Sequence, residues 1–150
     1  MTYPLSDAAA VIALSSTTIF AGAALYVSLV QYPARARLGA NAALAQWVHS
    51  YNGAPLLQTP VAAIGCIAAM ITAAFGGSPA WIVAALLIGF VVPFTKVVMP
   101  TGKYLFGPCR EPESKEIWRL MHEWSSLHAV RTLLSLIAAV LMLWAFIEKQ

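Results

Sequence analysis

The sequence has few charged residues, few cysteines and no basic stretch near its start. Charged side chains make up 10% of the 150 residues, whereas apolar ones make up 60%, more than in an average soluble domain. The two cysteines, Cys66 and Cys109, have no metal-site spacing, and their positions argue against a disulfide, so both are predicted to be free thiols. Without a basic stretch before it, the first apolar segment is expected to remain as a membrane anchor. These features argue against an ordinary soluble domain.

Four long apolar runs occupy most of the chain, at residues 8–30, 56–75, 80–99 and 127–147. Each has the roughly 20 residues that a helix needs to cross a bilayer. Such continuous runs exclude a β-barrel, whose strands alternate over about 10 residues. The sequence therefore predicts an all-α fold, a four-helix transmembrane bundle that forms a single integral membrane domain over residues 1–150.

The positively charged residues predict how this bundle is oriented. All of them except Lys149 lie in or next to the joins that follow the first and third runs: Arg35, Arg37, Lys96, Lys103, Arg110, Lys115, Arg119 and Arg131. By the positive-inside rule, both of these joins are cytosolic, and both termini of this multi-pass protein lie on the non-cytosolic side. The net charge of +3 reflects these loops and indicates no nucleic-acid partner.

Residues 34–51 are too polar to span the membrane, but their apolar residues recur at helical spacing. Leu44, Trp47, Val48 and Tyr51 fall on one face. This pattern predicts a short amphipathic helix between spans one and two, at the cytosolic interface or folded over the mouth of the bundle. Two nearby polar residues, His49 and Asn52, could face inward, although a solvated position is the alternative for the histidine.

The third run contains Gly89 and Pro93, which predict a kink, because proline removes one amide donor and crowds the carbonyl four residues earlier. Lys96 follows near the cytosolic end of this run. Its ammonium group either reaches the membrane surface or faces the interior of the bundle.

The fourth run begins with polar residues that fall on one helical face. Trp124, His128, Arg131 and Ser135 follow the spacing i, i+4, i+7 and i+11. No proline or glycine follows Pro112, so one helix is predicted to run unbroken into the span. The polar face is expected to point into the bundle, because an arginine facing lipid costs at least about 2.5 kcal/mol. Ionisable groups at this depth are candidates for function.

Three interpretations of this face compete. Arg131 could reach lipid phosphate while His128 binds a backbone carbonyl, which is a structural role. A metal or haem site would need partners such as His49 or His122, whose spacing does not support one. In the catalytic interpretation, His128 is a general base and Arg131 stabilises a developing anion.

Short motifs spread over most of the chain resemble the anthrone-oxygenase-like family of small four-helix integral membrane proteins. They are Tyr32-Pro33-Ala34-Arg35, Pro93-Phe94-Thr95, Met99-Pro100-Thr101 and the segment from Trp124 to Thr132. The sequence departs from the family pattern at Gln31, where members often have an acidic residue that could orient the histidine, and at Gly102, where they often have asparagine.

The resemblance implies a monooxygenase of polyketide biosynthesis that converts an anthrone to a quinone with dioxygen and without flavin, haem, metal or other cofactor. His128 and Arg131 would then be catalytic. Substrate contacts are expected from Trp124, Trp47, Gln31, Lys96, Phe94, His49 and Asn52. The implied partners are an apolar aromatic substrate, dioxygen and the bilayer, with homo-oligomerisation left open. The alternative is a non-catalytic membrane protein that binds or carries a lipid or quinone in the same cavity.

Overall fold

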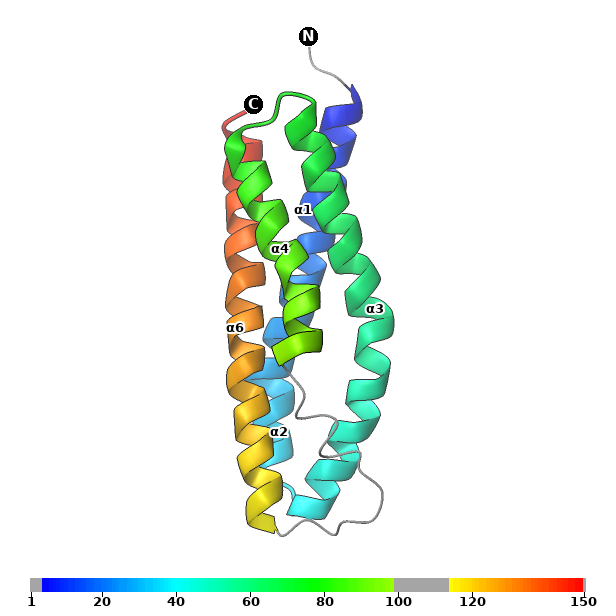
Figure 1. Ribbon diagram of the computed structural model, residues 1–150, viewed down its shortest axis with the longest axis vertical. Helices are drawn as coiled ribbons and strands as arrows, with labels where there is room; N and C mark the ends of the chain where they lie inside the picture. The colour runs from blue at the N-terminus through cyan, green and yellow to red at the C-terminus, as the bar shows by residue number, and fades with distance from the viewer. Residues whose placement is uncertain (1–3, 99–113, 150) are drawn as a thin grey trace.

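The computed structural model describes residues 4–98 and 114–149, and within these ranges the chain is helical and contains no strand. The elements are α1 (Pro4–Tyr26), a π-helix η1 (Val27–Gln31), α2 (Tyr32–Ala36), α3 (Ala40–Ala74), α4 (Pro79–Val98) and α6 (Ser114–Ile147). They run alongside one another in an elongated bundle, and the two ends of the chain lie at the same end of it (Figure 1). The all-α prediction is confirmed for the described residues.

The helices pack in a ring, in which α1 contacts α3 and α6, and α4 contacts the other sides of α3 and α6. Small residues allow the close approaches, as is common where helices pack in lipid. A Cβ atom added to Gly65 of α3 would lie 2.7 Å from Oγ1 of Thr17 on α1. One added to Gly89 of α4 would lie 3.0 Å from Sγ of Cys66 on α3.

Two apolar clusters fill the interior of the bundle. The larger one lies near the two ends of the chain and joins all four long helices, with Phe20, Trp81, Ile88, Val91 and Met142 among its buried members. The second joins the first part of α3 to the first part of α6 and contains Ala43, Trp47, Ile117, Met121 and Trp124.

The outer surface changes from apolar to polar along the bundle. Large apolar side chains are exposed along the later parts of α3 and α6 and on α4, among them Leu57, Ile67, Leu86, Leu133 and Val140. By contrast, the exposed positions at the start of α3 and α6 include Gln46, His49, Lys115, Arg119 and Glu123. Three helical stretches are long and apolar enough to cross a membrane: Leu5–Ala36, Leu56–Ala74 and Lys115–Ile147. The apolar part of α4, Pro79–Thr95, is shorter. These properties are those of a membrane protein.

Two helix boundaries differ from the sequence prediction. The helix of the first apolar run does not end near residue 30 but passes through η1 into α2 and ends at Ala36. Pro33 lies in the first turn of α2, where its missing amide hydrogen is tolerated. Residues 40–51 do not form a separate amphipathic helix. They are the first part of the continuous helix α3, and their apolar face packs against α6 instead of lying on its own at the interface.

The predicted continuity of the last helix is confirmed from Ser114 to Ile147. Both α3 and α6 extend beyond the described end of α4, so that the lower part of the bundle in Figure 1 is built mainly from the first part of α3, the first part of α6 and α2. The 35 residues of α3 and the 34 residues of α6 correspond to helices about 50 Å long, well above the roughly 30 Å thickness of the hydrocarbon core of a bilayer. We call the part of the bundle with exposed apolar side chains the apolar belt. His128 and Arg131 of α6 lie where this belt meets the polar lower part of the bundle.

Candidate active site

The polar face of α6 points into the bundle, as the sequence predicts. Trp124, His128, Arg131 and Ser135 are all buried, whereas the neighbouring Val130 and Leu133 are exposed. The unbroken helix explains this arrangement, because positions separated by three or four residues lie above one another on one face.

His128 is held by a backbone carbonyl of the first helix. Its Nε2 lies 3.2 Å from the carbonyl oxygen of Ala24. Since a carbonyl oxygen can only accept, Nε2 carries the hydrogen and donates it, which leaves the lone pair of a neutral imidazole on Nδ1. This Nδ1 is buried and has no hydrogen-bond partner within the described parts of the chain. One face of the ring is covered by the indole of Trp124, with ring centroids 4.9 Å apart and an interplanar angle of 17°.

Two hydroxyl groups surround the carbonyl that holds His128. Oγ of Ser28 donates to the oxygen of Ala24 at 3.2 Å, and Oγ1 of Thr132 lies 3.4 Å from the same oxygen. The two hydroxyls are 3.2 Å apart. The network links the last turn of α1 to α6 and fixes the orientation of the imidazole.

Arg131 lies one turn further along α6 than His128. Its Nη2 donates to Oε1 of Gln58 on α3, and its guanidinium carbon lies 5.0 Å from the ring centroid of Phe20. Its Nε is buried and has no acceptor among the described residues. The ion pairs of the described residues, Arg119–Glu123 and Lys149–Asp7, do not include it. Gln58 was not among the predicted site residues.

A second buried arginine also lies against Trp124. Arg35, in α2, is only 1% exposed, and its guanidinium carbon lies 5.9 Å from the centroid of the Trp124 ring. Its Nε donates to Oε1 of Gln46 at 3.2 Å, while Nη1 finds no acceptor in the part of the chain that the structure describes. Sequence reasoning placed this residue only in a cytosolic join. Its position in the Tyr32-Pro33-Ala34-Arg35 motif is the signal that could have identified it.

Aromatic side chains of α3 complete the wall around Trp124. Trp47 is 1% exposed and meets the Trp124 ring edge to face, with centroids 5.8 Å apart. Tyr51 stacks on Trp47, with ring centroids 4.9 Å apart. The structure therefore brings together the two tryptophans that were predicted to contact substrate, and it adds Tyr51.

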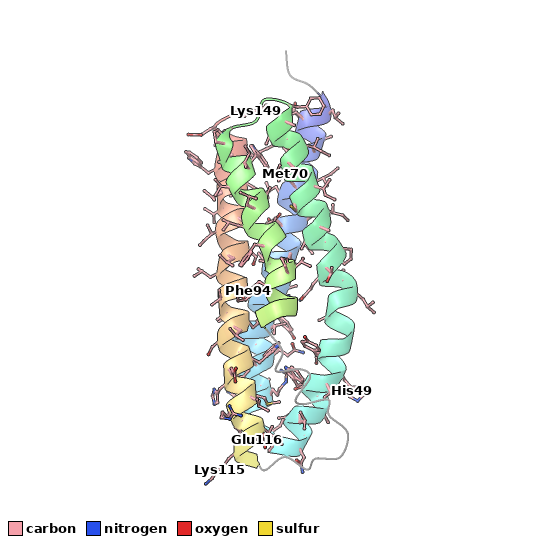
Figure 2. The ribbon with its side chains drawn as sticks, in the orientation of Figure 1. His49, Met70, Phe94, Lys115, Glu116 and Lys149 are labelled. Carbon is pink, nitrogen blue, oxygen red and sulfur yellow. The ribbon has the colours of Figure 1, made fainter. Side chains whose placement is uncertain are left out.

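Other predicted site residues lie apart from this cluster. His49 is exposed, and its side chain points away from the bundle (Figure 2). Nε2 of Gln31 donates to Oγ of Ser50 at 3.0 Å and does not orient His128. Phe94 packs on Phe90 of its own helix, with ring centroids 5.7 Å apart.

For two further predicted residues, Lys96 on α4 and Asn52 on α3, the side chains lie outside the described set. His122 lies off the polar face of α6, and its Nδ1 is 2.8 Å from Oη of Tyr32. Among residues 4–98 and 114–149, no three His, Cys, Asp or Glu side chains form a group that could hold a metal ion.

The site thus contains a buried, oriented imidazole one helical turn from the buried Arg131. The imidazole stacks on Trp124, which also contacts Trp47 and the guanidinium of Arg35. The unpartnered polar atoms of Arg35, Trp124, His128 and Arg131 are not accessible to solvent in this structure. A ligand that reached them would have to displace side chains of the aromatic wall. Chemically, the arrangement can accept a proton at Nδ1 of His128 and donate hydrogen bonds to an anion.

The chain is similar to a known protein family. No curated protein and no solved structure matched the chain. The family model described as anthrone oxygenase matches residues 47–141, a range that contains Trp47, Gln58 and the whole polar face of α6. Because this match covers more than half of the sequence, the chain belongs to the anthrone oxygenase family.

Proposed function

We propose that this protein is a membrane-embedded oxygenase that converts an anthrone-type polycyclic phenol to the corresponding quinone with dioxygen. The observation that carries the proposal is the buried Nδ1 of His128, which is free to accept a proton within one helical turn of Arg131. Family membership supports an oxygenase-like role in general, and the site supports this particular chemistry.

An anthrone is a carbon acid, and loss of a proton from its central methylene carbon gives an aromatic oxyanion. Nδ1 of His128 accepts that proton, and the guanidinium of Arg131 stabilises the oxyanion with hydrogen bonds. The electron-rich carbon then reduces dioxygen and forms a carbon–oxygen bond, which gives a peroxide. Loss of the second hydrogen of this carbon with cleavage of the O–O bond yields the quinone carbonyl and one water molecule.

The proposed reaction uses no separate cofactor, because the deprotonated substrate itself supplies the electrons that reduce dioxygen. The tasks left to the protein are to bind a flat apolar molecule, to remove its proton and to exclude water. Trp47, Tyr51 and Trp124 offer ring faces and edges suited to a polycyclic substrate. A site at the edge of the apolar belt also suits a substrate that dissolves poorly in water.

The proposed arrangement in the membrane is four passes with both termini on the non-cytosolic side. Two chain ends at the same end of the bundle fit an even number of passes (Figure 1). Arg35, Arg37, Lys115 and Arg119 lie at the opposite end, which the positive-inside rule assigns to the cytosol. The candidate site would then lie in the cytosolic half of the bundle.

A direct assay separates this proposal from the non-catalytic alternative, a carrier of lipids or quinones. Purified protein in detergent is mixed with emodin anthrone, and quinone formation is followed by absorbance against protein-free detergent and a His128→Ala variant. An oxygenase accelerates quinone formation with matching consumption of dioxygen. A carrier binds the compound but leaves the rate at the spontaneous level, and that result would refute the enzymatic proposal.

A further inference from the structure

Four buried polar atoms of Arg35, Trp124, His128 and Arg131 lack partners among the described residues. We group them in two pairs, because Arg35 lies over Trp124 and because His128 and Arg131 are one turn apart on α6. At one end, Nη1 of Arg35 and Nε1 of Trp124 are both donors. At the other end, Nε of Arg131 is a donor and Nδ1 of His128 is an acceptor. The proposed reaction uses the second pair and leaves the first pair without a role.

Both donors of the first pair are deeply buried. Arg35 is 1% exposed and Trp124 is 7% exposed, and the guanidinium lies over the indole at 5.9 Å. An unpaired buried donor loses its hydrogen bonds to water, and a buried cation without an anion is more costly still. Within residues 4–98 and 114–149, no carboxylate forms an ion pair with Arg35, whose described acceptor is the neutral amide of Gln46.

We infer that the ligand of this site is a polycyclic aromatic acid, whose carboxylate binds Arg35 and Trp124 while its reactive carbon lies at His128. The inference rests on the proposed function. A carboxylate has two oxygens and can accept from both donors of the first pair, and its charge would compensate the guanidinium. Neutral ligands of the same shape would leave that cation unpaired.

The spacing of the two pairs fits such a ligand. Trp124 and Arg131 lie about two helical turns apart on α6, which corresponds to about 10 Å along the helix axis. Three linearly fused six-membered rings have a similar length. An acid group at one edge of a tricyclic skeleton would therefore reach Arg35 while the rings lie along Trp124 and His128, whose own rings are stacked.

Arg35 and Arg131 would then affect different kinetic parameters. The carboxylate is charged before the reaction begins, so Arg35 would lower the dissociation constant and the KM of acidic substrates. The oxyanion forms only during the reaction, so Arg131 would act on kcat. Arg35 is thus a residue that determines which substrates bind.

The test compares two quinones that differ in one group, anthraquinone-2-carboxylate and 2-(hydroxymethyl)anthraquinone. Binding to the full-length protein in detergent is measured by quenching of tryptophan fluorescence. We expect the carboxylate to bind on the order of 10-fold more tightly, since hydrogen bonds to a charged group are among the stronger ones. Arg35→Gln should remove this preference and Arg35→Lys should restore part of it. Arg37→Gln, which changes an exposed arginine two positions away, should preserve it.

Absence of a preference in the wild-type protein would overturn the inference, as would a preference that survives in Arg35→Gln. If Arg35→Gln does not fold, the carboxylate preference is measured in Trp124→Phe instead. This variant removes the Nε1 donor and keeps an aromatic ring over His128. An unchanged preference in that variant would also overturn the inference. Oxidation of neutral emodin anthrone without any carboxylate preference would refute only the acid ligand, whereas a preference without oxidation would refute only the enzymatic proposal.

Discussion

His128 and Ala24 are joined by a hydrogen bond of 3.2 Å between helices α6 and α1, from residues 104 positions apart in the chain. The bond determines which nitrogen of the imidazole carries the hydrogen and therefore which one can act as a base. A backbone carbonyl thus supplies the orientation that an acidic residue in place of Gln31 could have given. A structural role and a catalytic role of His128 are compatible, because they use different nitrogens.

Replacement of His128 by alanine is expected to lower the rate of anthrone oxidation by roughly 10²- to 10⁴-fold, because it removes the proton acceptor. Initial rates of quinone formation above the spontaneous rate give the measurement. His122→Ala is the matched control, since His122 lies on the same helix but off the buried face. Equal rates for both variants and the wild type would mean that another group removes the proton.

Arg131→Lys is expected to lose a large part of kcat, on the order of 10²-fold, because an ammonium group cannot reproduce the planar set of donors of a guanidinium. Arg131→Leu should lose more activity, yet it should fold as well as the wild type, because an apolar side chain carries no desolvation cost in this position. Thermal unfolding in detergent separates folding from turnover. Near-normal turnover by Arg131→Lys would point to a purely structural arginine.

Active protein is expected to be colourless and insensitive to chelators. The sequence contains no glycine-rich nucleotide-binding motif and no histidine and carboxylate spacing typical of a metal site. Absorbance spectra and metal analysis of active preparations, together with assays after treatment with EDTA, provide the check. Activity that disappears with EDTA and returns with a transition metal would contradict a cofactor-independent mechanism.

The predicted orientation in the membrane can be tested by cysteine labelling. Cys109 belongs to the join assigned to the cytosol, so a membrane-impermeant maleimide should label it only after cells are lysed. Glu148→Cys in a Cys109→Ser background changes an exposed position near the C-terminus and should be labelled in intact cells. The reverse pattern would invert the proposed topology.

Gly65→Ala is expected to destabilise the bundle by about 1–3 kcal/mol, because the added methyl group would lie 2.7 Å from Oγ1 of Thr17. Gly22→Ala is the control, since nothing lies within 4 Å of its added methyl group. It should be neutral or stabilise the helix by up to about 1 kcal/mol. Thermal unfolding in detergent measures both changes. The double variant Thr17→Ala/Gly65→Ala should recover much of the lost stability, and failure to do so would mean that another contact limits the approach of α1 and α3.

Sequence reasoning predicted the parts of the fold and site that depend on one helix at a time. The buried face with Trp124, His128 and Arg131 follows from periodicity along an unbroken helix, and the continuity of α6 follows from the absence of proline and glycine. The apolar spacing of residues 44–51 was also interpreted correctly as helical, although the partner of that face is α6 and the helix continues to Ala74 instead of forming a short separate helix.

The parts that were missed depend on contacts between distant helices. Gln58 and Arg35 join the site through side-chain contacts of α3 and α2 with α6. No local pattern marks Gln58, and only the Tyr32-Pro33-Ala34-Arg35 motif marks Arg35. A backbone carbonyl such as that of Ala24 carries no signal in the side-chain sequence at all. The polarity of the predicted join also did not indicate which of its side chains are buried. His49 is exposed, whereas Arg35, assigned to the same join, is buried.

The π-helix η1 has a consequence for how this family can vary in length. A π turn accommodates one residue more than an α turn. The side chains of α1 and α2 therefore point in the same relative directions as they would in an unbroken α-helix that is one residue shorter. Removing one exposed residue of η1, such as Leu29 or Val30, would convert the turn to an α-helix and leave both Ala24 and Arg35 facing the site. A deletion elsewhere in α1 would rotate everything after it by about 100°. Single-residue length differences among relatives are therefore expected to fall within residues 27–31.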